Sequence, residues 1–144
     1  MYEYACEVKR VVDGDTIDVV LDLGFDILHK SRVRLYGIDT PESRTRNLDE
    51  KARGKMAGAY LKEAVEKGEK VVIQTKLKDS RGKYGRVLGN VVVDGVNINE
   101  AMIENFLAVA YFGQSKDDVE AEHLINREKL IEQGLFTPEE SKWK

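Results

Sequence analysis

The chain has 144 residues, of which 42% are hydrophobic and 34% are charged, and its formal net charge is −3. This length and apolar content favour one compact domain over residues 1–144 with its own hydrophobic core, and they exclude a disordered chain. The negative charge argues against a protein that packages nucleic acid, because such binding depends on Lys and Arg displacing counterions from phosphates. The charge is also uneven, since residues 30–53 are rich in Lys and Arg and residues 117–140 are rich in Asp and Glu.

Neither a targeting signal nor a membrane segment is visible in the sequence. The first residues, MYEYACEVKR, carry charge where an export signal would have a basic start followed by an apolar run. No stretch approaches the length of about 20 apolar residues that a membrane span requires, so we expect no membrane partner. The localisation stays open between the cytoplasm and export with removal of a signal, and we expect a monomer.

The first third of the chain predicts three β-strands, at residues 5–10, 16–23 and 30–37. Each of them alternates or mixes apolar and polar side chains, as half-buried strands do. Residues 24–26 predict a turn between the last two strands. The one cysteine, Cys6, has no partner for an intramolecular disulfide, and its place in the first strand favours a buried thiol.

A helical period begins at Leu48 and continues to Gly68, which predicts an amphipathic helix. Residues 71–74 and 86–93 predict two further strands, joined by a polar loop at residues 78–83.

The last third predicts two more helices. Asn97, with Glu100 three residues later, resembles the capping box that begins a helix, here one that runs through Leu107. The last helix is expected at residues 118–133, with Gly134 at the position where helices favour a glycine. Three strands, a helix, two strands and two helices predict an α+β fold, a five-stranded oligonucleotide-binding barrel with three helices.

Four carboxylates lie in two short clusters, each at the edge of a predicted strand: Asp13, Asp15, Asp39 and Glu42. If the second and third strands pair as an antiparallel hairpin, Asp15 comes next to Asp39. Two carboxylates at that distance repel each other, and a hard cation such as Ca²⁺ or Mg²⁺, which takes oxygen ligands, is the usual solution. The alternative is that both clusters are only turns, because Asp, Gly and Pro are common in turns of every kind.

The third predicted strand carries two arginines on the face opposite Val33 and Leu35. Arg34 precedes Asp39 and could place its planar guanidinium against a phosphate. By itself such an arginine is more often a solvated charge, which is our interpretation of Arg32.

Three motifs, in this order and at compatible spacing, resemble the staphylococcal nuclease family: residues 12–16 (VDGDT), 34–42 (RLYGIDTPE) and 83–86 (KYGR). The likeness continues through residues 96–101 and 110–111, so it covers nearly the whole chain. It implies an oligonucleotide-binding barrel with three helices, a Ca²⁺ site, and endonuclease cleavage of DNA and RNA to 3′-phosphate products.

The resemblance also implies roles for individual residues, matched by position. Asp15 and Asp39 would be carboxylate ligands of the metal, and Thr40 would offer its backbone carbonyl. Asp13 would lie just behind these ligands. Glu42 would orient or deprotonate the attacking water.

The resemblance further implies that Arg34 and Arg86 bind the phosphate and that Lys83, Tyr84 and Tyr111 line the nucleotide pocket. Physical chemistry agrees with these roles, because in-line attack on a phosphodiester concentrates negative charge on the phosphate oxygens, which a divalent ion and two guanidinium groups stabilise. A carboxylate within one water of the metal can accept the proton of the attacking water or only orient that water.

Two segments depart from the family pattern, and both concern substrate preference. After Tyr111 the chain reads Phe112-Gly113, so a second pocket tyrosine is missing. Residues 43–49 also differ, where a mobile loop beside the site is expected. The negative net charge predicts weaker long-range capture of polynucleotides.

Other interpretations of the sequence are supported by fewer features. The second hypothesis is a barrel that binds nucleic acid or protein without cutting, but such modules typically lose the catalytic charges that are all present here. A structural subunit has no positive feature behind it. His29 and His123 lack the neighbours of a zinc site and are interpreted as surface residues. Residues 82–85 lack the spacing of a P-loop, and Trp143 is expected to pack.

Overall fold

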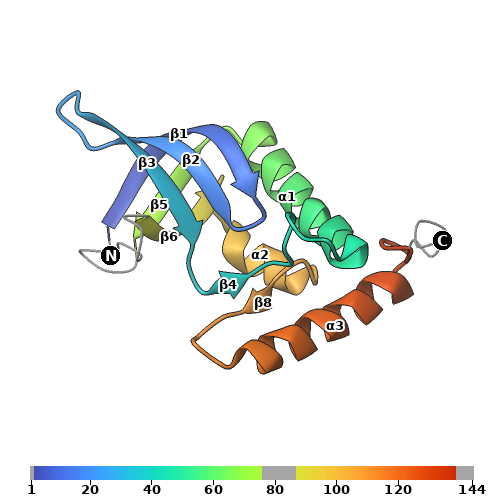
Figure 1. The fold of residues 1–144 in the computed structure, drawn as a ribbon. Coiled ribbons are helices and arrows are strands. Elements are labelled where there is room, and N and C mark those ends of the chain that lie inside the picture. Colours follow the sequence, from blue (N-terminus) through green and yellow to red (C-terminus); the bar gives the residue numbers. More distant parts are fainter. Residues whose placement is uncertain (1, 76–86, 139–144) are drawn as a thin grey trace.

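The computed structural model describes residues 2–75 and 87–138. Its elements follow the predicted order, with short additional strands (Figure 1). The strands are β1 (Tyr2–Asp13), β2 (Thr16–Asp22), β3 (Leu28–Leu35), β4 (Ile38–Asp39), β5 (Val71–Thr75), β6 (Val87–Val93), β7 (Val96–Asn97) and β8 (Val109–Ala110). The helices are α1 (Leu48–Lys67), α2 (Ile98–Glu104) and α3 (Lys116–Glu132).

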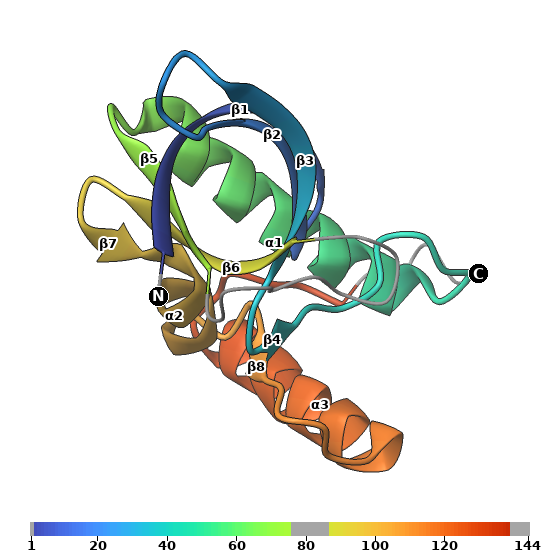
Figure 2. The ribbon, with the colours of Figure 1, turned by 90° about the vertical axis from the view of Figure 1, so that its left-hand side faces the viewer.

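Five strands close into a barrel. The order in the main sheet is β3-β2-β1-β5-β6-β7, and neighbours in this order are antiparallel. β3 also pairs in parallel with β6, with Val33 beside Val87 and Leu35 beside Gly89, which joins the two sides of the sheet (Figure 2). Within the described residues, the barrel and its three helices confirm the predicted α+β oligonucleotide-binding fold.

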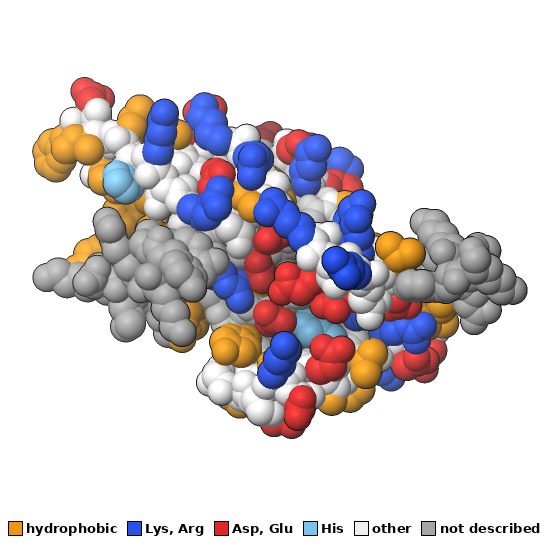
Figure 3. All heavy atoms as spheres, in the orientation of Figure 1, with side chains coloured by type: hydrophobic (Ala, Val, Ile, Leu, Met, Phe, Trp, Pro, Cys, Tyr) orange, Lys and Arg blue, Asp and Glu red, His pale blue; other side chains and the backbone are white. Residues whose placement is uncertain are grey.

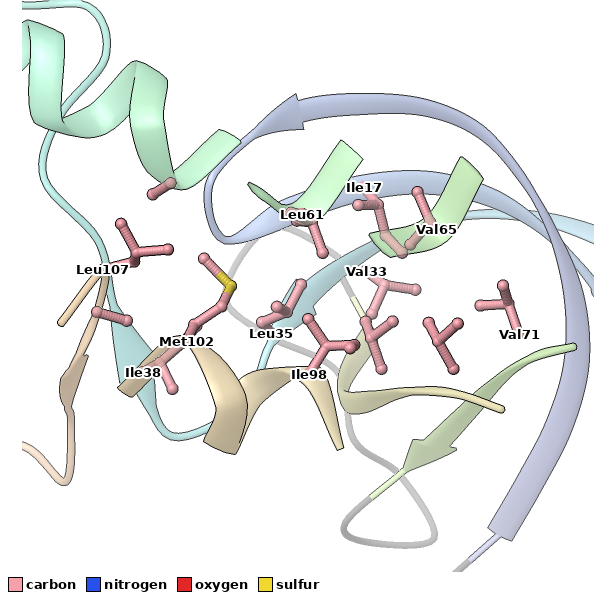
Figure 4. Close-up of a cluster of buried hydrophobic side chains, with 14 of the residues drawn as sticks. Ile17, Val33, Leu35, Ile38, Leu61, Val65, Val71, Ile98, Met102 and Leu107 are labelled. Carbon is pink, nitrogen blue, oxygen red and sulfur yellow. The ribbon is translucent and has the colours of Figure 1, made fainter. Parts of the chain in front are cut away.

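Alternate residues of the strands and one face of α1 form the hydrophobic core (Figure 4). Ile17 of β2 and Val33 and Leu35 of β3 are at most 1% exposed, which confirms the inward face predicted for β3. Leu61 and Val65 of α1 close the barrel against Ile17 and Val33 (Figure 4). Burying each such side chain stabilises the fold by about 1.5–3 kcal/mol, so the turns between these strands extend from a rigid base.

A buried asparagine ties the end of β3 to β6 and α2. Asn99 is 3% exposed, accepts a hydrogen bond from the Val91 amide at 3.0 Å and donates one to the Tyr36 carbonyl at 2.9 Å. Tyr36 directly follows β3, so this contact sets the point at which the chain leaves the barrel for β4. At the start of α2, Asn97 accepts from the Glu100 amide at 3.2 Å, which confirms the predicted cap.

The two C-terminal helices each differ from prediction at one end. α2 ends at Glu104, three residues early, because Phe106 takes a left-handed φ of 62° with which no α-helix continues. α3 begins at Lys116, before the predicted start, because the Ser115 side chain caps it by accepting from the Asp118 amide at 3.1 Å. The bounds of α1 agree with prediction.

Some smaller expectations are settled by the same structure. The turn after β2 is confirmed, with residues 24–26 all at positive φ. Cys6 is half-buried, so the prediction of a buried thiol is right only in part, and burial raises the pKa of the thiol to about 11. No helix in the described ranges is long and apolar enough to cross a membrane. The predicted loop at residues 78–83 and Trp143 lie outside the described residues.

Candidate active site

The β1–β2 turn, the end of β3 and the short strand β4 lie together at one end of the barrel (Figure 1). The hairpin of β2 and β3 pairs Thr16 with Arg34, and the Leu35 amide donates to the Asp15 carbonyl at 2.8 Å. Asp15 is therefore directly beside Arg34. β4 brings Asp39 to the same arginine, so the two carboxylates expected next to each other lie on either side of it.

Arg34 makes one short ion pair and one longer ion pair. Its Nη1 atom is 2.7 Å from Asp15 Oδ2, and its Nη2 atom is 3.8 Å from Asp39 Oδ1. Nη2 also donates to the Ile38 carbonyl at 3.3 Å. Nη1 is buried and close to Asp15, yet its N–H groups are not aligned with any acceptor in the described part of the chain. The guanidinium thus lies between two carboxylates, and with 19% of its side chain exposed Arg34 is not the solvated charge that a lone arginine on a strand more often is.

The folded state disfavours the charged form of the Asp15 carboxyl, although Arg34 lies next to it. Burial, followed by a hydrogen bond and repulsion from Asp13, raises the pKa of Asp15 from the ordinary value of 3.8 to about 7. Arg34 and the Thr16 hydroxyl, which donates to Asp15 Oδ1 at 3.1 Å, oppose that rise only in part. Ionisation of Asp15 therefore destabilises the folded state, and a bound cation would offset this loss of stability.

Neutralising Asp15 should stabilise the cation-free protein at alkaline pH. Because the folded pKa lies above the unfolded one, the native state holds the extra proton between about pH 4 and 7, and stability falls as the pH rises through that window. At about 1.4 kcal/mol for each pH unit, a rise from 3.8 to about 7 makes the effect at pH 8 on the order of 4 kcal/mol. We expect Asp15→Asn in chelator to be at least as stable as the parent at pH 8 and to lack this pH-dependent loss, as measured by urea unfolding at pH 4.5 and 8.

Asp18→Asn is the matched control for this measurement. The hydrogen bond from Arg32 lowers the pKa of Asp18, so its contribution to stability is present above the unfolded pKa and lost as the pH falls. Asp18→Asn should therefore lose stability at pH 8, opposite in sign to Asp15→Asn. A clear loss at pH 8 in Asp15→Asn would instead make Asp15 a turn residue that holds the strand end.

Glycines let α1 and the two acidic turns approach closely. A Cβ at Gly54 of α1 would lie 2.6 Å from the Pro41 carbonyl oxygen and 2.7 Å from backbone atoms of Glu42. A Cβ at Gly14 would lie 2.8 Å from Ala57 Cβ. Contacts this short are not tolerated, so these positions hold the backbone that carries Glu42 against the helix. The apolar period of α1 predicted the helix but not this role.

Glu42 lies at the mouth of a cavity of about 350 Å³ between β4, β8 and the start of α3. Its amide donates to Glu50 Oε2 at 3.0 Å, which orders the backbone there. Its carboxylate is exposed and has no hydrogen-bond or ion-pair partner among the described residues. Arg34, Asp39, Thr40, Tyr111 and His123 also line this cavity. Figure 3 shows that acidic side chains gather at the centre of this face and that basic ones lie above them.

Tyr111 stands between two cavities. Its amide donates to the Gly37 carbonyl at 2.7 Å, beside the pairing of β4 with β8, and its side chain is 44% exposed. Together with Arg34 it lines both the cavity of Glu42 and a second one of about 380 Å³, which also includes Tyr36 and Phe112. The predicted residues Lys83, Tyr84 and Arg86 lie outside the described residues.

His123 is the functional candidate that sequence reasoning missed. We predicted a surface histidine, but His123 is only 7% exposed, and its Nε2 atom is 2.8 Å from Asp39 Oδ2. The other histidine, His29, is exposed as predicted. The available signal was weak: His123 and the apolar Leu130 are seven residues apart on α3 and so share the face that turns inward. Nothing local indicated that this face meets β4.

The candidate metal ligands at this end of the barrel are all oxygen atoms, which are the ligands that a hard cation prefers. No three His, Cys, Asp or Glu side chains of residues 2–75 and 87–138 gather in a metal-binding arrangement. The groups expected to hold a cation at this end of the barrel are two carboxylates, Asp15 and Asp39, and the Thr40 carbonyl, so water would have to complete the shell. Oxygen-only ligands of this type fit Ca²⁺, and burial, the main cause of the raised pKa of Asp15, disfavours its charged form, which a bound cation would favour.

Comparison with known proteins relates the chain to one family and to several named endonucleases. The family described as "Staphylococcal nuclease homologue" matches residues 32–134. Among curated proteins of Bacillus subtilis (strain 168), the chain is 34% identical to "Endonuclease YhcR" over 116 residues, which are 76% of this chain and 9% of that protein. It is 38% identical to "Endonuclease YncB" over 105 residues, which are 72% of this chain and 47% of that protein. It is 40% identical to "SPbeta prophage-derived endonuclease YokF" over 105 residues, 72% of this chain and 33% of that protein.

The chain thus matches less than half the length of each of these three relatives. The matched region contains Arg34, Asp39 and Glu42, together with the barrel closure and the helices that carry the cavity. The chain belongs to the staphylococcal nuclease family.

Proposed function

We propose that the chain is a calcium-dependent nuclease that hydrolyses phosphodiester bonds within DNA and RNA and leaves 3′-phosphate products. The observation that carries this proposal is the meeting of Arg34 with Asp15 and Asp39 beside the unpartnered carboxylate of Glu42. Membership of the family and the relatives named as endonucleases support it.

In this proposal Asp15, Asp39 and the Thr40 carbonyl hold the Ca²⁺. The bound ion supplies positive charge against the negative charge that develops on the phosphate oxygens. Asp13 supports the ligands from behind, since its Oδ1 accepts from the Asp15 amide at 3.3 Å. Thr40 is 6% exposed, so its backbone is held firmly in the loop that leads to Glu42.

Glu42 is the proposed base, or the group that orients the attacking water. A free carboxylate at the rim of the cavity can accept the proton that water loses as it attacks phosphorus. Arg34, which contacts both carboxylates and lines the cavity of Glu42, is the proposed partner of a phosphate oxygen, and Arg86 is assigned as the second arginine on the sequence motif alone. Tyr111, which lines the cavity together with Arg34, is assigned with Lys83 and Tyr84 to the nucleotide pocket by the motif.

Calcium dependence is the first test of this function. Plasmid DNA and single-stranded RNA should be cut in Ca²⁺ and left intact in excess chelator, because the oxygen ligands carry uncompensated charge without the ion. Mg²⁺ should support much slower cleavage, since its strict octahedral shell suits this site less well. New DNA ends should become extendable by a polymerase only after phosphatase treatment, as 3′-phosphates require.

Full activity in excess chelator would contradict the metal assignment. Binding of DNA in Ca²⁺ with no cleavage would instead support the second hypothesis, a module that binds without cutting. Calcium should also raise the free energy of unfolding by about 2.7 kcal/mol at a hundredfold excess over its Kd, and by much less in Asp15→Asn. An equal rise in both proteins would show that Asp15 is not a ligand.

A further inference from the structure

A groove of about 390 Å³ runs between the end of β1 and α1, next to the site described above. Asp13 lines it from one side, and Ser43, which follows Glu42, lines it from the other. Its floor includes the small residues Gly54, Gly58 and Ala59 of α1.

The groove is basic although the chain as a whole is acidic. Three cations line it, Arg44, Lys55 and Lys62, against one carboxylate, Asp13. Lys55 and Lys62 are seven residues apart on α1 and therefore share one face. Within the described residues neither Arg44 nor Lys55 has an ion-pair partner, and Lys62 has only an exposed contact with Glu66 at 4.0 Å. An exposed pair at that distance holds the lysine weakly, so all three charges are available to a ligand.

A weaker excess of positive charge continues along the barrel. A second groove of about 530 Å³ shares Val11 and Lys62 with the first and is lined by two further cations of β1, Lys9 and Arg10, and by two carboxylates, Glu7 and Glu66. Lys9 pairs with Glu7 at 2.8 Å. Figure 3 shows Lys and Arg side chains gathered on this face over the strands and α1, beside the acidic centre. Beyond the first groove, Arg10 therefore adds one cation that has no ion-pair partner among the described residues.

We propose that this groove binds the phosphate backbone of the substrate strand beyond the bond that is cut. The proposal rests on the nuclease function and names the surface that holds the polynucleotide. Exposed Lys and Arg side chains bind successive phosphates by releasing counterions, without reading sequence. The groove explains how a chain of net charge −3 retains a polyanion next to an acidic centre.

Charge removal in the groove tests this proposal. The variant Arg44→Gln/Lys55→Gln/Lys62→Gln should raise the Kd and the KM for a long single-stranded oligonucleotide at least tenfold at low salt. Its turnover on a dinucleotide, which is too short to reach the groove, should be unchanged. The slope of log K against log salt should become shallower by about 2, since each lost contact with a single strand removes about 0.7.

Lys67→Gln/Lys70→Gln/Lys129→Gln is the matched control, because it changes the net charge equally at exposed positions outside the groove. It should leave the oligonucleotide KM close to that of the parent. Equal losses in both triple variants, or an unchanged KM in the groove variant, would overturn the proposal. Failure of the nuclease function itself is distinguishable, because the parent would then not cut the dinucleotide.

The contact between His123 and Asp39 carries a second, independent proposal. The two residues are 84 positions apart, and the Nε2–Oδ2 distance is 2.8 Å. The His123 side chain is 9% exposed, whereas Asp39 is 31% exposed and lies on a strand of two residues. α3 is held in place separately, by the Asn126 side chain, which donates to the Ala108 carbonyl at 3.1 Å, and by buried Leu130.

We infer that His123 is a positioning residue for Asp39. A carboxylate only accepts hydrogen bonds, so His123 donates its Nε2–H to Oδ2 and restrains the rotation of the carboxylate. Oδ1, which has no hydrogen-bond partner among the described residues, is left for the cation. Hydrogen bonds that orient a metal ligand in this way typically contribute about 10- to 100-fold in metal affinity.

Calorimetric titration of Ca²⁺ tests this role without relying on activity. His123→Ala should raise the Kd for Ca²⁺ about 10- to 100-fold, and His123→Gln, which keeps a donor, should recover much of the loss. Asn126→Ala is the control, since it loosens the docking of α3 without touching Asp39, and its Kd should stay near the parent value. A lower melting temperature in chelator with an unchanged Kd in His123→Ala would overturn the inference, as would a parent that binds no Ca²⁺.

Discussion

Replacing Arg34 by alanine should lower turnover on DNA by on the order of 10²- to 10³-fold, because one preorganised charge partner of the transition state is removed. Arg34 is the only residue of its strand that touches both carboxylates in the described contacts, and it lines the cavity that Glu42 also lines. Initial rates at saturating Ca²⁺ with a plasmid or labelled oligonucleotide measure the effect. Arg34→Lys should recover little, since a lysine cannot form the planar fork.

Arg32→Ala is the matched control for this loss. Arg32 lies two residues earlier on the same face of β3, but it pairs with Asp18 at 2.8 Å at the exposed side of the sheet and lines no part of the active-site cavity. Exposed pairs of this kind contribute about 0–1 kcal/mol to stability, so turnover should stay close to that of the parent. Comparable losses in both variants would mean that the assignment of Arg34 to the phosphate is wrong.

Replacing Glu42 by glutamine should slow turnover by on the order of 10²- to 10⁴-fold, the usual contribution of a positioned base. The substitution keeps the size of the side chain and the backbone contact with Glu50. Affinity for Ca²⁺ should be largely retained, because Glu42 is not among the proposed ligands. Rates and calorimetric titration on the same protein separate the two effects.

Glu120→Gln tests whether this loss is specific to Glu42. Glu120 lines the same cavity from α3, and we assign it no role in the reaction. Its substitution should leave turnover within a fewfold of the parent. Near-normal turnover in Glu42→Gln would remove Glu42 from the mechanism, and a large loss in Glu120→Gln would point to the cavity's overall charge instead.

Local pattern alone predicted most of the elements of this protein. The alternation in β3 placed Val33 and Leu35 inward, and the helical period of α1 ran between the observed ends. Asn97 indicated the start of α2. These features depend on neighbours within a few residues, so the chain encodes them before any long-range contact forms. The motifs also predicted the family, since they combine residue type with order and spacing.

The tertiary structure alone decided which charges meet. Sequence placed Asp15 beside Asp39, but barrel closure and strand register put Arg34 between them. His123 was interpreted as a surface residue, yet docking of α3 buries it against Asp39, 84 positions away. Contacts of this kind depend on how the helices pack on the closed barrel and on the direction of the side chains at that interface. The local sequence pattern encodes neither the helix packing nor the side-chain direction, because segments that are distant in the chain determine them.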